Sequence, residues 1–355
     1  MTTREQQLAH QKGEIEFRKK LYLQQVEGKP VLDDELDASQ IEEVLEDRMK
    51  RTLDQMTRLQ QRGIGLTPYI EIGAERCQRS LVMENDVGVN GAAVDISYDL
   101  LKSCSHYQDV FKRAQSPVRI CCDANNLPFM TSSIVFVFCY ETLHHFPDPA
   151  PITKEVYRVL LPGGSFFFDE EPYKQMLRLR LYTSSKMYSS GSLMRSRMRR
   201  LLDRFFSAMS CNEIEHGIIE NNDMSISLWK HALAPFDQKE VELKATSSIR
   251  SALFNPSSYI KYYAACLLGG NISGICRKPG ATVNSKRSIY GALICPSCRQ
   301  EGGEMPLNQK NSSFFCPKCS KTYPVVGGVL FLFAYDKFAE LYPQIFDSFG
   351  LAGRA

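Results

Sequence analysis

Two pairs of cysteines near the end of the sequence have the spacing of metal ligands. Two residues separate Cys295 from Cys298 and Cys316 from Cys319, and 17 residues lie between the pairs. Two thiolates on one tight turn can face the same ion, and two such turns complete a tetrahedron of sulfur ligands around Zn²⁺. Because four thiolates leave no open coordination position, we expect structural zinc that takes no part in a reaction. The alternatives are four unrelated cysteines or two disulfides.

A second group of residues follows predicted strands in the first half of the sequence: Gly73, Asp95, Asp123 and Tyr140–Glu141. In an open parallel sheet, ligands bind outside the carboxyl ends of the strands. A glycine in such a turn lets the backbone approach a ligand closely. The two aspartates could accept hydrogen bonds from ribose hydroxyls and from the exocyclic amine of adenine.

The elements that position these residues alternate between strands and helices from about residue 68. The apolar run over 134–140 is typical of a strand buried on both faces. This alternation predicts an α/β fold with a parallel sheet and helices on both sides. We expect strands over 69–72, 91–95, 118–123, 134–140, 165–169, 239–243 and 272–277, and a helix over 152–161.

Three regions are predicted: an N-terminal helical region over 1–65, a sheet domain over 66–280 with a helical lid inserted at 173–235, and a zinc ribbon over 287–340. In the first region, Ser39 and Glu42 form a capping-box pattern. The helix that follows carries an apolar stripe, which should pack on the next domain or on a second copy: Ile41, Leu45, Met49, Leu53 and Met56.

Five motifs in order resemble those of class I S-adenosylmethionine-dependent methyltransferases, in the branch of quinone biosynthesis. They cover about Pro68 to Glu171 and imply a Rossmann-like sheet. The motifs are Glu71–Glu75, Asp95–Ser97, Asp123–Phe129, Leu143–Asp148 and Tyr157–Gly164.

The resemblance implies a role for each matching residue. Glu71 would face the amino group of the cofactor's methionine part, Asp95 the ribose, and Asp123 with Ala124 the adenine. Further cofactor contacts are implied for Gly73, Ala74, Glu75, Ile96 and Tyr140.

The sequence departs from the family at Glu75 and Cys77, where glycine is usual, and at Val135, which replaces an acid often seen early in the fourth strand. Larger side chains would narrow the space around the cofactor, and Glu75 would add negative charge there. A catalytically silent scaffold that stabilises another methyltransferase is therefore one alternative.

The candidate general bases are His144 and His145, with Glu141 and Tyr140 as further candidates, because an imidazole titrates near neutral pH. We expect at least one of the two histidines to be structural. No Asn/Asp-Pro-Pro-aromatic motif follows the fourth strand, which argues against methylation of amide or planar amino nitrogen. We expect a small or lipid- or sugar-linked acceptor methylated on oxygen or carbon, with RNA as the alternative.

The cysteine-rich segment from Leu293 to Leu332 is similar to the small zinc-binding activator subunit of tRNA, ribosomal-RNA and release-factor methyltransferases. That subunit stabilises its catalytic partner. The resemblance therefore implies that this ribbon packs on, and stabilises, the catalytic domain of its own chain.

Charge and hydropathy bear on partners and location. The formal net charge of +3 does not imply a strongly polyanionic partner, although nine cations cluster between Lys174 and Arg204. They could bind phosphates or form a solvated surface. The polar start of the sequence and the absence of an apolar run of about 18 residues predict a cytoplasmic protein without a transmembrane segment. The oligomeric state does not follow from the sequence.

Overall fold

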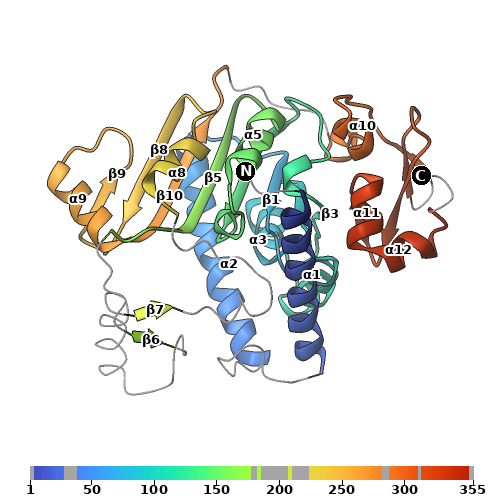
Figure 1. Cartoon of the computed structure of the whole chain (residues 1–355), viewed down its shortest axis with the longest axis horizontal. Helices are drawn as coiled ribbons and strands as arrows, with labels where there is room; N and C mark the ends of the chain where they lie inside the picture. Colours follow the sequence, from blue (N-terminus) through green and yellow to red (C-terminus); the bar gives the residue numbers. More distant parts are fainter. Residues whose placement is uncertain are drawn as a thin grey trace.

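The computed structural model describes residues 4–27, 38–176, 182–184, 207–209, 224–281, 288–310 and 313–351. One mixed sheet of 12 strands runs through the molecule, in the order β11-β12-β13-β14-β3-β2-β1-β4-β5-β10-β8-β9 (Figure 1). The expected α/β fold with a Rossmann-like sheet is confirmed. The central strands are β1 (Tyr69–Ile72), β2 (Gly91–Asp95), β3 (Val118–Cys122), β4 (Ile134–Tyr140), β5 (Leu160–Tyr173), β8 (Gln238–Lys244), β9 (Arg250–Ala252) and β10 (Gly270–Arg277).

Strand direction determines where a ligand can bind. β3, β2, β1, β4 and β5 run parallel to one another, whereas β10 is antiparallel to both β5 and β8. Every residue of β4 is buried, as its apolar sequence predicts. The chain order reverses between β1 and β4, so loops on either side of β1 diverge at their carboxyl ends and leave room for a ligand.

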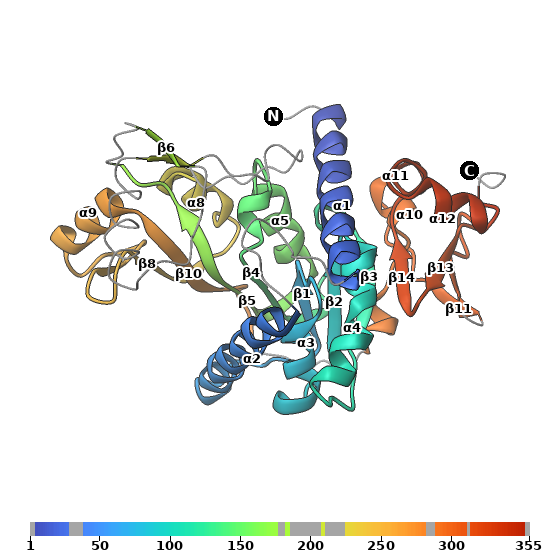
Figure 2. The same cartoon turned by 90° about the horizontal axis from the view of Figure 1, so that it is seen from below.

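Helices cover both faces of the sheet: α2, α3 and α4 lie on one side, and α5 and α8 on the other (Figure 2). The predicted stripe of α2 packs inward, with Leu53 half-buried and its other four members buried. The helices are α1 (Arg4–Val26), α2 (Ala38–Gln61), α3 (Gln78–Val82), α4 (Tyr98–Val110), α5 (Ala150–Val159), α8 (Ile226–Ala232) and α9 (Tyr259–Leu268), with short turns η1 (Met83–Val87), η2 (Ala124–Asn126), η3 (Leu143–His145) and η4 (Tyr290–Ala292).

The cysteine-rich segment continues the central sheet instead of forming a separate one. β14 pairs in parallel with β3, with Val329 opposite Arg119 and Leu332 opposite Cys122. The elements of this segment are α10 (Pro296–Gln300), β11 (Asn308–Lys310), β12 (Ser313–Phe315), β13 (Thr322–Val326), β14 (Val329–Leu332), α11 (Tyr335–Leu341) and α12 (Pro343–Ser348).

The β13–β14 hairpin turns on Gly327 and Gly328, whose φ values of +55° and +75° suit a tight hairpin turn. A β-carbon on Gly328 would lie 2.3 Å from the guanidinium of Arg119 on β3. The end of the Arg119 side chain could move aside, so glycine is needed here for the positive φ of the turn.

The predicted lid over 173–235 is described only in part. Its described elements are two short paired strands, β6 (Tyr182–Ser184) and β7 (Ser207–Met209), and the helix α8. Of the cations counted between Lys174 and Arg204, all but Lys174 lie outside the residues whose side chains are described. Within the described residues, no helix is both long and apolar enough to span a bilayer.

Phe331 on β14 should be important for joining the ribbon to the sheet. Its ring is fully buried and lies 5.2 Å from that of Tyr98 and 5.4 Å from that of Phe338, centroid to centroid. We expect Phe331→Ala to lower the free energy of unfolding by about 3–5 kcal/mol in denaturant titrations, because the ring leaves a cavity. Phe349→Ala, at a half-exposed ring, is the matched control and should have little effect. Equal effects of the two substitutions would contradict this packing.

Candidate functional site

A cavity lies at the carboxyl ends of β1 to β4, beneath the N-terminal helix α1. Its empty space is about 760 Å³ when the part open to solvent is counted. Among the residues predicted to bind a cofactor, Gly73, Glu75, Asp95, Ile96, Asp123, Ala124 and Tyr140 line it. The structure therefore brings together residues that are up to 67 positions apart in the sequence, as the strand-end prediction requires.

Gly73 supplies the close backbone approach that this cavity needs. Its φ is +69°, and a β-carbon there would lie 2.3 Å from Oγ1 of Thr142. Its N–H donates to the carbonyl of Val94 on β2 at 3.0 Å, which holds the turn against the neighbouring strand. Ala74 is fully buried and does not line the cavity.

Asp95 ends β2 and is held by backbone groups. Its two oxygens accept hydrogen bonds from the N–H of Glu75 at 2.9 Å and from the N–H of Ser97 at 2.8 Å. Burial nevertheless raises the pKa of Asp95 to about 6. The carboxyl group is thus oriented toward the cavity and titrates close to neutral pH.

The C-terminal segment provides a charged partner for Asp123. Its carboxylate pairs with the ammonium of Lys337 on α11 and accepts from the backbone and side-chain N–H groups of Asn125, both at 2.9 Å. Burial alone would raise the pKa of Asp123, but Lys337 outweighs this effect and lowers it. The predicted adenine-binding acid is therefore an ionised carboxylate with a cation beside it.

Glu75 does not add an uncompensated charge. Its side chain lies 3.2 Å from Arg48 and 3.7 Å from Arg18. These guanidinium groups outweigh the burial and lower the pKa of Glu75 to about 2. Cys77, the other departure from the family, is fully buried and does not line the cavity.

Glu71 lies on β1 but does not line the cavity. It accepts a hydrogen bond from the hydroxyl of Ser80 at 2.5 Å, and burial raises its pKa to about 8 although Arg79 opposes this shift. A largely protonated carboxyl group at neutral pH is poorly suited to pair with an ammonium group. The role predicted for Glu71 stays a prediction.

Tyr140 ends β4, Glu141 follows it, and both line the cavity. The hydroxyl of Tyr140 donates to Gln55 at 2.5 Å, and the guanidinium of Arg79 lies 4.2 Å from the ring centroid. Burial raises the pKa of Tyr140, which keeps the phenol protonated. Glu141 pairs with Arg48 at 3.3 Å, and burial raises its pKa.

The two neighbouring histidines have different surroundings. His144 is buried away from the cavity, and its Nδ1 lies 3.0 Å from the carboxylate of Glu171 on β5. Glu171 also accepts from the backbone N–H groups of Thr142, Leu143 and His144. His145 lines the cavity. Glu171 and His144 thus fix the loop that presents His145.

The sequence reading missed the contribution of α1. His10, Glu14 and Arg18, at a spacing of four residues, line the cavity together with Gln11. The spacing indicates one helical face, but a charged face of a helix is usually solvated, so the sequence alone gave no reason to place it over a ligand.

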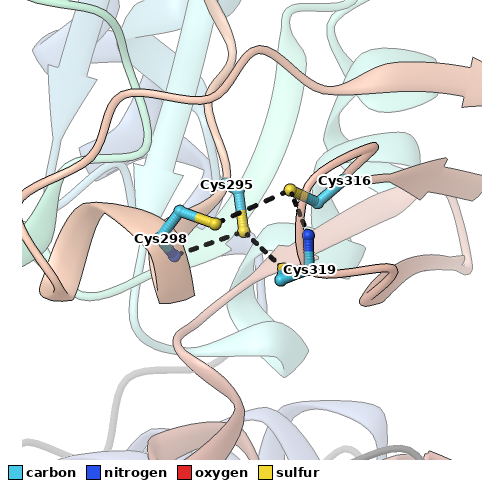
Figure 3. A group of neighbouring side chains, drawn as sticks. All are labelled: Cys295, Cys298, Cys316 and Cys319. Atoms are coloured by element: carbon cyan, nitrogen blue, oxygen red, sulfur yellow. Dashed lines mark hydrogen bonds between the residues drawn. The ribbon is translucent and has the colours of Figure 1, made fainter.

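The four cysteines converge as predicted (Figure 3). Their sulfur atoms all lie within 4.8 Å of one another, with 3.5 Å between Cys295 and Cys319 and 3.7 Å between Cys298 and Cys316. A tetrahedron with zinc–sulfur bonds of about 2.3 Å has edges of about 3.8 Å. The N–H groups of Cys298 and Cys319 face the sulfur atoms of Cys295 and Cys316. The donor set and its geometry fit a four-thiolate metal site.

Comparison with known proteins gives the class of the central domain. A family described as a methyltransferase domain matches residues 70–168. An uncharacterized chloroplastic methyltransferase of Arabidopsis thaliana is 30% identical over 107 residues, which are 28% of this chain and 30% of the relative. The matched segment thus spans less than a third of that relative's length.

Two solved structures are similar at lower identity. The PH0226 protein of Pyrococcus horikoshii OT3 is 17% identical over 66% of this chain and 90% of its own, with a TM-score of 0.41. Phosphoethanolamine N-methyltransferase 2 of Haemonchus contortus, in complex with S-adenosylmethionine, is 16% identical. The match covers 65% of this chain and 53% of that protein, with a TM-score of 0.36.

The family match begins in β1 and ends in β5, so it contains the four strand ends that form the cavity. Residues 70–168 thus match a family described as a methyltransferase domain, and they form the parallel part of the Rossmann-like sheet.

Proposed function

We propose that the chain is an S-adenosylmethionine-dependent methyltransferase with a structural zinc ribbon. The observation that carries the proposal is the acidic cavity at the ends of β1 to β4, with Gly73 at its floor and no room there for a side chain. The residues present fit the cofactor: Asp95 would accept from the ribose hydroxyls, and Asp123 with Ala124 would border the adenine. When bound, the cofactor supplies a methyl group activated by a sulfonium.

The acceptor that we propose is small, or lipid- or sugar-linked, and is methylated on oxygen or carbon. His145 supports this choice because it lines the cavity next to the loop after β4, where an imidazole could take a proton from a hydroxyl or an acidic carbon. An RNA acceptor would need a cationic surface, and the predicted basic run lies almost entirely outside the described side chains. A silent scaffold is disfavoured by a cavity whose glycine turn and strand-end acids are all in place.

We propose that the ribbon stabilises the cofactor-binding loops. The hydroxyl of Tyr342 donates to the carbonyl of Ile96 at 2.6 Å and accepts from the N–H of Tyr98 at 3.0 Å, so it holds the loop after Asp95. The metal site lies against the start of α11, because Ser297, between two of the cysteines, accepts a hydrogen bond from the N–H of Tyr335. A cytoplasmic location stays a prediction from the sequence.

Cofactor binding should depend on the ionisation of Asp95. Its neighbours are Arg18, Glu14 and two backbone N–H groups. Because an ionised carboxylate accepts hydrogen bonds from hydroxyls more strongly than a protonated one, we expect the affinity for S-adenosylhomocysteine to fall below pH about 6, by at most about tenfold per pH unit. Titration calorimetry from pH 7.5 to 5 measures this. Asp95→Asn should bind more weakly at neutral pH and lose this part of the pH dependence. A wild-type chain that binds no cofactor would refute the proposed function.

His145 should act on the acceptor and His144 on the loop. With methyl-labelled S-adenosylmethionine and cell extract, we expect label in a ribonuclease-resistant small-molecule or lipid fraction. His145→Asn should lower transfer by about 10²–10⁴-fold with little change in cofactor affinity. His144→Asn should instead lower the melting temperature, because it leaves the buried Glu171 without its imidazole partner. His106→Asn, an exposed histidine on α4, is the control. Ribonuclease-sensitive label would establish the RNA alternative.

Loss of a zinc ligand should destabilise the chain. We expect one zinc ion per chain by elemental analysis and almost none in Cys316→Ser. Its melting temperature should fall by on the order of 10 °C, since structural zinc contributes several kcal/mol and each is worth about 2–4 °C. Cys276→Ser, a buried cysteine on β10 outside the cluster, should keep its zinc. Unchanged stability of the zinc-free variant would rule out a stabilising ribbon.

A further inference from the structure

Glu14 and Arg18 form an oppositely charged pair on the face of α1 that covers the cavity. They lie one helical turn apart, and Nε of Arg18 donates to Oε1 of Glu14 at 2.7 Å. Both side chains are at least 85% buried and both line the cavity. A paired carboxylate and guanidinium at a ligand site match a ligand that itself carries both charges.

The protein does not satisfy all the hydrogen-bonding atoms of Glu14 and Arg18. The second oxygen of Glu14, Oε2, is buried and has no hydrogen-bond donor among the described residues. The same is true of Oε1 of Gln11, one turn earlier on the same face. Buried acceptors without a donor are rare and costly, so a ligand with donors is the expected partner. Arg18 has five N–H donors, of which Nε serves Glu14 and Nη1 faces Glu75 at 3.7 Å.

Glu14 is charged when the ligand arrives. Burial alone would raise its pKa, but Arg18 and the neighbouring His145 and His10 lower it. Its Oε2 is thus an ionised, desolvated acceptor, which binds a cationic donor more strongly than a neutral one.

The other acids near the cavity are less suited to bind an ammonium group. Asp123 already pairs with Lys337, and Glu141 with Arg48. Glu75 is held between Arg48 and Arg18, and Asp95 by two backbone N–H groups. Glu71, for which the sequence predicted this role, does not line the cavity. Glu14 remains as a buried cavity acid with an open oxygen.

We propose that Glu14 and Arg18 of α1 bind the amino-acid end of the cofactor, with Glu14 receiving its ammonium group and Arg18 its carboxylate. This assignment rests on the proposed use of S-adenosylmethionine. It makes α1 part of the cofactor site and places ammonium recognition outside the glycine-rich turn.

Two ligands distinguish binding of the amino-acid end from a general effect on cofactor binding. S-adenosylhomocysteine carries the amino-acid end, whereas 5′-methylthioadenosine has the same adenosine and sulfur without it. In calorimetry with the full chain, we expect Glu14→Gln to weaken S-adenosylhomocysteine binding by about 10- to 100-fold and to leave 5′-methylthioadenosine binding nearly unchanged. Arg18→Gln should weaken S-adenosylhomocysteine binding more than 5′-methylthioadenosine binding, and it should weaken both, because it also removes the cation beside Glu75 and Asp95.

Two further variants sharpen the test. Glu16→Gln removes an exposed acid from the same helix and should affect neither ligand. Glu71→Gln keeps the shape of a carboxyl group that is already largely protonated, so it too should bind both ligands normally.

The outcomes are distinct. If the wild type binds neither ligand, the proposed function is wrong and this assignment falls with it. If the wild type binds both, but Glu14→Gln weakens both equally or neither, the cofactor use stands and the assignment to Glu14 is wrong. If Glu71→Gln selectively weakens binding of S-adenosylhomocysteine, Glu71 binds the ammonium group, as the sequence predicted.

Discussion

Arg18 holds together a cavity whose other charged lining is mainly acidic. Glu14, Glu75 and Asp95 converge beneath α1, and three carboxylates in one buried space repel one another unless a cation lies among them. The guanidinium contacts Glu14 and Glu75 directly, and its charge also favours the ionised form of Asp95. It thereby fastens α1 to the loops after β1 and β2. The same pairing leaves an acidic environment suited to a cationic cofactor.

The C-terminal segment is joined to this site by backbone pairing and by two side chains. β14 continues the sheet at β3, so the strand that precedes Asp123 is paired on both edges. Lys337 neutralises Asp123, and Tyr342 holds the loop that follows Asp95. Under the proposed function, a metal site with no open coordination position would influence cofactor binding through the rigidity of these loops, without taking part in the reaction.

The sequence predicted much of the catalytic half because its signals are local. Alternation of apolar strands and helices located β1 to β5 within a few residues, and a strand-end position identified Asp95 and Asp123 before any contact was known. It could not show which of His144 and His145 is buried and which lines the cavity. That distinction depends on Glu171, which lies 26 residues beyond His145 on another strand. Nor could it show that Glu71 faces Ser80, since the side of the sheet that a buried strand residue takes follows from packing.

The sequence by itself therefore determined the Rossmann-like sheet, the positions of the acids at the strand ends and the four converging thiolates, because spacing along one chain dictates them. Tertiary structure decided which charges meet. It placed His10, Glu14 and Arg18 over the cavity, Arg48 beside Glu75 and Lys337 beside Asp123. These partners come from helices far away in the sequence. The sequence of a charged helical face does not indicate whether water or a ligand will cover it.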